Sequence, residues 1–426
     1  MKNQSRPELL MPAGSLEKLE YAFAYGADAA YLGVPFFSLR ARENEFDLEA
    51  LFKARQIADQ NNKKIYVTAN VFAKNRKLSS FLPQLRSWLE AKPDALIMGD
   101  PGLMMLAREQ HPDLEIHLSV QANAMNWQSV KFWHKSLNVK RIILSRELHL
   151  DEVREIKQRV PEVEIEAFVH GSICIAYSGR CLLSSYMSYR DANQGVCDNS
   201  CREKFNVYSA KDVSKEDDNI YVEDLRAQGS LYRINEDENG TFIMNAKDLR
   251  LIEHLNEIHE AGVCSFKVEG RTKSVNYVSL VARAYKNAID DMMRGQAFDQ
   301  SLLGDLDKVA NRGYDTGFMM SKLPGHKSQN YETSVARHFT RKFGGVITRF
   351  DNTPAGYLSI DVRNKLSVGK ECELITPEKE PIRFTINKIL NLKNESVEIA
   401  NGGTGIYFLA GDFDKNPSHG ILSIEP

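Results

Sequence analysis

The chain has 426 residues, of which 42% are hydrophobic and 26% charged, and its formal net charge is −2. This length predicts two or three domains, or one large barrel with an appended domain, and it allows a sizeable core without disulfide bonds. The composition is ordinary for a soluble globular protein. The charge balance excludes the strongly basic classes such as histones, although a local basic face remains compatible with nucleic-acid binding.

The N-terminal segment MKNQSRPELLMPAGS contains no apolar stretch typical of a signal peptide. No apolar run approaches the roughly 20 residues that a membrane helix needs. We therefore expect a cytoplasmic protein without a membrane segment, in which thiols stay reduced. Three short basic segments, KNRK (74–77), GRTK (270–273) and RHFTRK (337–342), are most simply solvated surface patches when each is taken singly.

From residue 7 to about 290, short apolar runs alternate with amphipathic stretches of helical periodicity. The runs are ELLMPAG (8–14), AAYLGV (29–34), KIYVTANV (64–71), DALIMGD (94–100), EIHLSVQAN (115–123), RIILSREL (141–148), EIEAFVHG (164–171) and SFKVEGR (265–271). Residues 246–262 and about 273–295 also have helical spacing. Eight strand–helix repeats predict a closed (β/α)8, TIM-like barrel. An open doubly wound sheet is the alternative, but no G-x-G-x-x-G motif follows the first strand.

The connection between the seventh and eighth runs is long, and its middle is acidic and rich in turn residues. We expect a cysteine-bearing loop at 172–201 and a poorly packed insertion at about 202–243, built of hairpins. The barrel region, with this insertion, is predicted to span residues 1–330. From 335 to 426, short alternating runs separated by turn signals predict a small all-β, barrel-like domain.

Four of the six cysteines occur at 174, 181, 197 and 201, in the pattern C-x6-C-x15-C-x3-C. In a reducing compartment, clustered thiols indicate metal ligands rather than disulfides. Structural zinc sites use closely spaced pairs of cysteines, and of the two pairs here only Cys197 and Cys201 have such a spacing. Iron–sulfur clusters accept more varied spacings. The residues alone leave an iron–sulfur cluster, zinc and unrelated buried thiols open.

The run EAFVHGSICIAYSGRCLLS (166–184) resembles the signature of the collagenase-like peptidase family U32. The resemblance continues in PELLMPAGSLEKLEYAFAYGADAAYLG, DALIMGDPGL, IHLSVQANAMNW, RIILSREL, NAKDLR, KVEGRTKS and VRNKLSVG, and so covers essentially the whole chain. It is strongest to a branch that hydroxylates tRNA. It implies hydroxylation of the wobble uridine to 5-hydroxyuridine without molecular oxygen, with prephenate as a required metabolite.

The resemblance also implies a 4Fe–4S cluster held by Cys174, Cys181, Cys197 and Cys201. The partners it implies are the anticodon stem-loop of tRNA, prephenate as co-substrate or activator, and an electron donor. The segment after Cys201 is shorter here than in the family's enterobacterial members, which affects any role of that segment in gripping tRNA.

Polar side chains end most of the eight runs, and in a barrel this face carries the active site. A flipped base needs aromatic and amide groups, and a dicarboxylate such as prephenate needs arginines. The candidate catalytic residues are His170, Tyr177 and Glu269. The candidate substrate-binding residues are Arg40, Arg42, Asn70, Gln121, Asn123, Arg146, Arg180 and Arg271. Each has a structural alternative: a strand-end hydrogen bond for His170, packing for Tyr177, or an ion pair between Glu269 and Arg271.

Three other functions compete with tRNA hydroxylation. A peptidase follows from the family name, yet the sequence has no H-E-x-x-H or G-x-S-x-G motif. A non-catalytic RNA-binding protein with a structural metal is the second. Hydroxylation of another substrate, such as ribosomal RNA, is the third.

Overall fold

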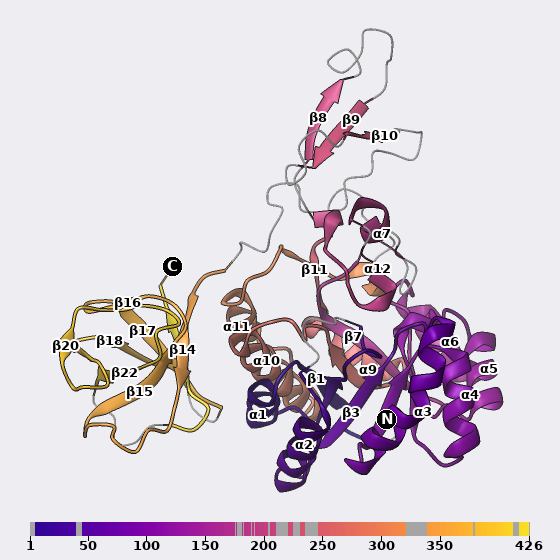
Figure 1. Ribbon diagram of the computed structural model, residues 1–426, viewed down its shortest axis with the longest axis horizontal. Coiled ribbons are helices and arrows are strands. Elements are labelled where there is room, and N and C mark those ends of the chain that lie inside the picture. Colours follow the sequence, from indigo (N-terminus) through magenta and orange to yellow (C-terminus); the bar gives the residue numbers. More distant parts are fainter. Residues whose placement is uncertain are drawn as a thin grey trace.

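The computed structural model describes residues 5–39, 45–174, 176, 181, 183–188, 190, 192–202, 205–209, 220–224, 231–234, 246–320, 339–377, 380–411 and 417–425. Within these ranges a barrel is joined to a β domain that lies beside its helices α10 and α11, and a small sheet lies above the barrel (Figure 1). None of the described helices is both long enough and apolar enough to span a bilayer. The predicted boundary between the two domains, at 330–335, falls outside the described residues.

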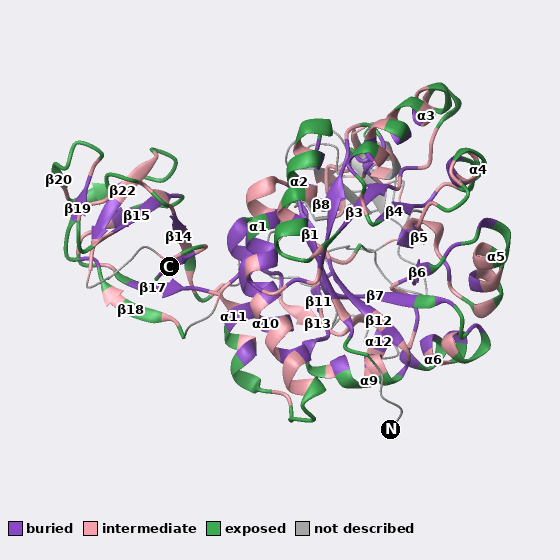
Figure 2. Cartoon of the chain, turned by 90° about the horizontal axis from the view of Figure 1, so that it is seen from below, coloured by how far each residue is buried: buried purple, intermediate pink, exposed green. Residues whose placement is uncertain are grey.

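Eight parallel strands form a closed ring, which confirms the predicted barrel. They are β1 (Glu8–Ala13), β2 (Ala29–Gly33), β3 (Lys64–Ala69), β4 (Ala95–Met98), β5 (Ile116–Leu118), β6 (Arg141–Ile143), β7 (Glu164–Gly171) and β12 (Val263–Val268). Pairing of β12 with both β1 and β7 closes the ring. The strands are buried almost throughout, whereas the outer faces of the helices are exposed (Figure 2). Burial on both faces is why these strands read as nearly continuous apolar runs.

Helices cover the outside of the barrel. They are α1 (Leu16–Ala24), α2 (Leu48–Gln60), α3 (Asn75–Glu90), α4 (Pro101–Gln110), α5 (Trp127–Leu137), α6 (Leu150–Arg159), α9 (Leu255–Glu260) and α10 (Val275–Met293). Side-chain caps set several starts: Ser15 accepts from the Lys18 amide at α1, and Asp100 accepts from two amides at α4, where Pro101 occupies the first turn. Ser274 caps α10 by accepting from the Tyr277 amide, which confirms the helix predicted at about 273–295.

The helical interpretation of residues 246–262 is wrong in its first half. Residues Asp248–Arg250 form strand β11, which runs antiparallel to the end of β7 and parallel to β13 (Tyr314–Asp315). A 3-10 turn at Ile252–His254 follows, and α9 begins only at Leu255. Asp248 accepts a hydrogen bond from Arg312 Nε at 3.1 Å, and both side chains are buried. Strand pairing and this buried ion pair therefore override the helical periodicity.

The long connection after β7 carries α7 (Leu183–Ser188) and 3-10 turns at Ala192–Gln194 and Ser200–Arg202. An antiparallel three-stranded sheet follows, made of β8 (Phe205–Ser209), β9 (Ile220–Asp224) and β10 (Leu231–Ile234), so hairpins occupy the predicted insertion (Figure 1). After α10 come the 3-10 turn Gln300–Leu302, α11 (Leu303–Asp307) and α12 (Gly317–Met320). A further 3-10 turn, Val120–Ala122, follows β5.

The C-terminal domain is all-β, as predicted. Its main sheet contains β14 (Lys342–Ile347), β15 (Tyr357–Val362), β17 (Glu371–Ile375), β18 (Ile382–Thr385), β19 (Ile389–Leu390), β20 (Ser396–Val397), β22 (Ile406–Ala410) and β23 (Ile421–Ile424). β16 (Leu366–Ser367) pairs with β21 (Ile399–Ala400). The domain docks on α1, where Tyr25 Oη donates to the backbone carbonyls of His419 (2.9 Å) and Ile375 (3.1 Å).

Candidate active site at the mouth of the barrel

A cavity of about 150 Å³ lies at the carboxyl ends of the barrel strands, the face where (β/α)8 barrels place their active sites. The four clustered cysteines line it together with side chains from the strand ends. Five of the predicted catalytic and substrate-binding residues lie on its walls: Asn70, Gln121, Arg146, Glu269 and Arg271. The fold therefore brings a thiol cluster, amides, arginines and a carboxylate into one space.

The thiols lie around the cavity rather than at one point. Among the described residues, no group of three or more His, Cys, Asp or Glu side chains is close enough together to hold a single metal ion. Burial raises the pKa of Cys181, and the neighbouring Cys174 and Cys197 add to this effect. Backbone N–H groups of Leu183 and Ser184 oppose it by donating to the thiolate. The backbone N–H of Asn199 donates to Cys197 Sγ at 3.4 Å. Such backbone donors to sulfur suit a cluster of several metal atoms held by thiolates.

Asp198 fixes the cysteine loop, although the sequence did not single it out. Its Oδ1 accepts from Ser184 Oγ (2.7 Å) in α7 and from the Ser200 amide (2.9 Å), and its Oδ2 accepts from Ser188 Oγ. Burial acts to raise the pKa of Asp198, but these hydrogen bonds outweigh it and hold the pKa well below the usual range. The carboxylate thus ties the segment carrying Cys197 to the helix that follows Cys181.

Three of the cavity residues also support the loops around it. Asn70 Oδ1 accepts from the Leu39 amide at 3.1 Å. Arg271 donates to Thr68 Oγ1 at 2.9 Å and to the Leu39 carbonyl. Arg146 donates to the Ser172 carbonyl at 2.8 Å and lies over the Phe168 ring, with 4.6 Å between its Cζ and the centroid. These contacts hold the Asn70 amide and the guanidinium groups of Arg146 and Arg271 in fixed positions at the cavity wall.

Two predicted site residues do not line the cavity. His170 is 1% exposed and packs against the rings of Tyr277, Tyr285 and Tyr314. Burial lowers the pKa of His170 to about 3, so the ring is neutral at physiological pH. Asn123 accepts from Ser145 Oγ at 2.6 Å. Four further candidates, Arg40, Arg42, Tyr177 and Arg180, lie outside the described residues, and their roles stay predictions.

Lys267 is a cavity residue that sequence reasoning missed. It is 3% exposed, and its Nζ lies 2.8 Å from Glu166 Oε1 and 4.4 Å from the centroid of the Tyr31 ring. Tyr31 in turn donates to Glu269 Oε2 at 3.2 Å. Burial lowers the pKa of Lys267, against the opposing effect of Glu166. Strand alternation could have found this lysine, because Ser265 and Lys267 alternate with apolar residues along β12 and so share one face of the strand.

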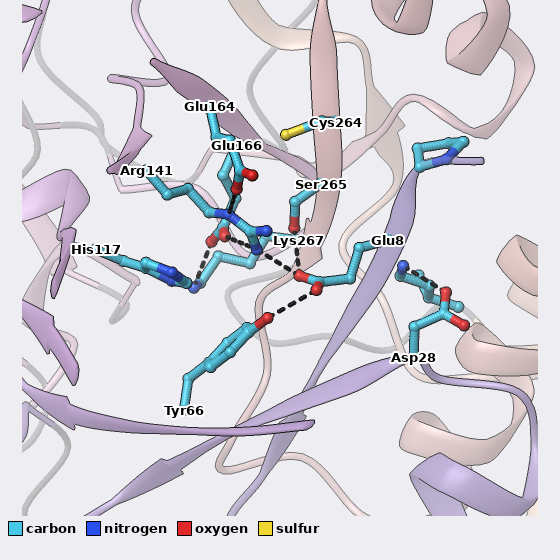
Figure 3. Close-up of polar contacts among 12 residues, drawn as sticks. Glu8, Asp28, Tyr66, His117, Arg141, Glu164, Glu166, Cys264, Ser265 and Lys267 are labelled. Atoms are coloured by element: carbon cyan, nitrogen blue, oxygen red, sulfur yellow. Dashed lines mark hydrogen bonds and ion pairs between the residues drawn. The ribbon is translucent and has the colours of Figure 1, made fainter. Parts of the chain in front are cut away.

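An ionic network fills the barrel below Lys267 (Figure 3). Arg141 lies 2.6 Å from Glu8 and 3.5 Å from Glu166, which is fully buried. Glu8 also accepts from Tyr66 Oη (2.7 Å) and Ser265 Oγ (3.0 Å). Each buried charge therefore has an opposite partner, which such charges require in a low-dielectric interior. The network thus joins charged side chains of β1, β6, β7 and β12 beneath the cavity floor.

Fold and site together define a (β/α)8-barrel protein with a cysteine cluster above the carboxyl ends of its strands. Residues 14–329 match the model of peptidase family U32, and residues 340–422 match the model of the peptidase family U32 C-terminal domain. The chain belongs to this family, which confirms the resemblance found in the sequence.

Named relatives in the family carry two kinds of description. The chain is 43% identical over 449 residues to the tRNA hydroxylation protein P of Haemophilus influenzae, covering 99% of this chain and 97% of that protein. It is 44% identical over 421 residues to the tRNA hydroxylation protein P of Escherichia coli, covering 93% and 92%. It is also 32% identical over 345 residues to a collagenase of Porphyromonas gingivalis, covering 78% and 77%.

Proposed function

We propose that this protein is a tRNA-modifying enzyme that hydroxylates the wobble uridine to 5-hydroxyuridine in the cytoplasm. The reaction proceeds without molecular oxygen, uses a 4Fe–4S cluster, and requires prephenate as co-substrate or activator. The observation that carries the proposal is the convergence of four thiols with amide, arginine and carboxylate side chains on one cavity at the barrel mouth. The assignment of tRNA as the substrate rests on the names of the relatives from Haemophilus influenzae and Escherichia coli.

The ligands of the cluster are Cys174, Cys181, Cys197 and Cys201. When bound, the cluster supplies one-electron chemistry that amino-acid side chains lack. The protein's own contribution is to hold the thiolates around the cavity and to satisfy them with backbone N–H groups.

The cavity walls suit a pyrimidine base and a dicarboxylate. Asn70 and Gln121 offer amide groups for the base edge, whereas the rings of Tyr31 and Phe168 have Lys267 and Arg146 on one face. The wobble base lies in a loop, so moving it out of its stack costs little compared with a paired base. Arg146, Arg271 and the buried Lys267 are the described cations of the wall, and arginine forks are the strongest donors to carboxylates. Arg40, Arg42 and Arg180 stay further candidates for prephenate.

The test begins with strictly anaerobic purification and quantification of iron, sulfide and zinc. About four irons and four sulfides per chain are expected. The purified protein is then incubated with tRNA lacking the modification, a reductant and prephenate, and the nucleosides are analysed by mass spectrometry. Formation of 5-hydroxyuridine that depends on prephenate supports the proposal. Zinc without sulfide, or no modified nucleoside from a cluster-loaded protein, contradicts it.

The collagenase among the relatives makes a peptidase the second candidate. A cysteine peptidase needs a histidine beside its thiol. No histidine is among the described residues that line the cavity, and His170 is enclosed by tyrosines. Gelatin hydrolysis by the cluster-free protein, abolished in a Cys181→Ser variant, would favour the peptidase.

A further inference from the structure

A second concave surface joins the barrel to the β domain. This groove, of about 190 Å³, is lined by Lys273 and Tyr277 from the start of α10, by Lys308 after α11, and by Arg341, Lys342 and Phe343 from the β domain. Two of the basic segments noted in the sequence, at 270–273 and 337–342, thus meet here although they are far apart along the chain. Four of these described lining residues are cationic and none is acidic.

Carboxylates near the groove neutralise some of its cations but not all of them. Glu373 is shared among three cations: Lys308 at 2.8 Å, Arg383 at 3.4 Å and Arg341 at 4.0 Å. Lys342 is exposed and makes no ion pair with any other described residue. Lys308 also lies 3.2 Å from Asp305, and Arg341 lies 4.0 Å from Glu425. The exposed Lys342 therefore contributes most to the positive charge that the groove presents to solvent.

One short segment of the chain connects the groove with the candidate active site. Glu269 and Arg271 line the cavity, and Lys273, two residues further on, lines the groove. Two residues span at most about 7 Å of extended chain. Tyr277 links both features, since its ring lines the groove while its hydroxyl donates to the Glu269 carbonyl at 2.8 Å. Residues 269–277 therefore contribute to both the cavity and the groove.

We propose that this groove, called here the basic groove, binds the sugar–phosphate backbone of the RNA substrate next to the modified nucleotide. The proposal rests on the proposed function and names the surface that positions its substrate. Cations attract phosphates, and the partly exposed rings of Phe339 and Phe343 suit stacking of unpaired bases, a combination that single-stranded RNA-binding surfaces share. Asn276 adds a polar group: it is 7% exposed, lines the groove, and its Oδ1 has no hydrogen-bond partner among the described residues.

The test compares the cluster-loaded wild type with a Lys273→Gln/Lys342→Gln variant. Binding of full-length tRNA is measured by fluorescence anisotropy at several salt concentrations. Loss of two phosphate contacts is expected to raise Kd about tenfold or more at low salt and to reduce the slope of log affinity against log salt by about 1.5. The matched control is Lys388→Gln/Lys393→Gln, which removes two exposed lysines of the same β domain outside the groove, and it should bind like wild type.

Two results overturn the basic groove: unchanged affinity and salt slope in the Lys273/Lys342 variant, or an equal loss in the control. Iron and sulfide content and the urea midpoint of each variant show that the fold is intact. Hydroxylation is measured separately at saturating tRNA. If the wild type binds tRNA through these lysines but forms no 5-hydroxyuridine, the RNA-binding role of the groove is supported and the proposed reaction is contradicted. If the wild type hydroxylates tRNA while the variant binds tRNA with wild-type affinity, the proposed reaction is supported and the RNA-binding role of the groove is contradicted.

Discussion

The buried neutral His170 makes the stability of the barrel depend on pH in a defined window. Burial lowers the pKa of His170 to about 3 in the folded protein, from 6.5 in the unfolded chain. Because the folded-state pKa is the lower one, the unfolded state binds the proton more readily between these two values. The contribution of this histidine to stability is therefore present above pH 6.5 and is lost progressively as the pH falls.

The size of this loss follows from the two pKa values. At pH 5.5, one unit below the unfolded pKa, protonation of the unfolded chain favours unfolding by about 1.4 kcal/mol relative to pH 7.5. The variant His170→Gln keeps an amide group that can hydrogen-bond to Tyr285 but cannot titrate. We expect the free energy of unfolding of the variant to fall less between pH 7.5 and 5.5 than that of wild type, by about 1.4 kcal/mol.

The assay is urea unfolding of both proteins at the two pH values. It is followed by tryptophan fluorescence, because all three tryptophans, at 88, 127 and 133, lie in helices of the barrel. Other titrating groups contribute equally to both proteins, so the difference between the two pH dependences isolates His170. If the free energy of unfolding depends on pH in the same way in wild type and variant, the conclusion that His170 is buried and neutral is wrong.

Three further predictions concern the interior, the thiols and the domain contact. Lys267→Met leaves the fully buried Glu166 carboxylate with only the 3.5 Å contact to Arg141, and should lower the free energy of unfolding by about 3 kcal/mol. Adding Glu166→Gln should recover part of that loss in urea unfolding, and a double variant less stable than the single one would contradict the pairing. Cys181→Ser should abolish both the iron–sulfur absorbance and tRNA hydroxylation, and an active, cluster-free variant would disprove the ligand assignment. Tyr25→Phe removes the hydroxyl whose single proton is shared between two carbonyls of the β domain, and should lower the thermal midpoint through a loss of about 1–2 kcal/mol, whereas an unchanged midpoint would show that this contact adds no stability.

Local pattern was sufficient for most of the architecture. Each barrel strand and most of the helices could be recognised from the pattern of apolar residues within them. In the β domain, apolar and polar residues alternate along the strands, and turn residues lie between the strands. The spacing of the cysteines singled out the loop after β7, and the polar ends of the runs indicated Asn70, Gln121 and Arg146 before any contact was known. The helical interpretation of Asp248–Arg250 failed because periodicity does not report a pairing partner that lies elsewhere in the chain.

The sequence was sufficient to predict the eight strand–helix repeats, the all-β C-terminal domain and the clustering of four thiols, because these features depend on residues close together in the chain. Other features could be seen only in the folded protein: β12 pairs with β7, Lys267 faces Glu166 inside the barrel, His170 is buried away from the cavity, and residues 273 and 342 meet in one groove. Each of these depends on contacts between distant segments. Such contacts form only when the ring closes and the β domain docks, and no local pattern encodes which distant partner each side chain meets.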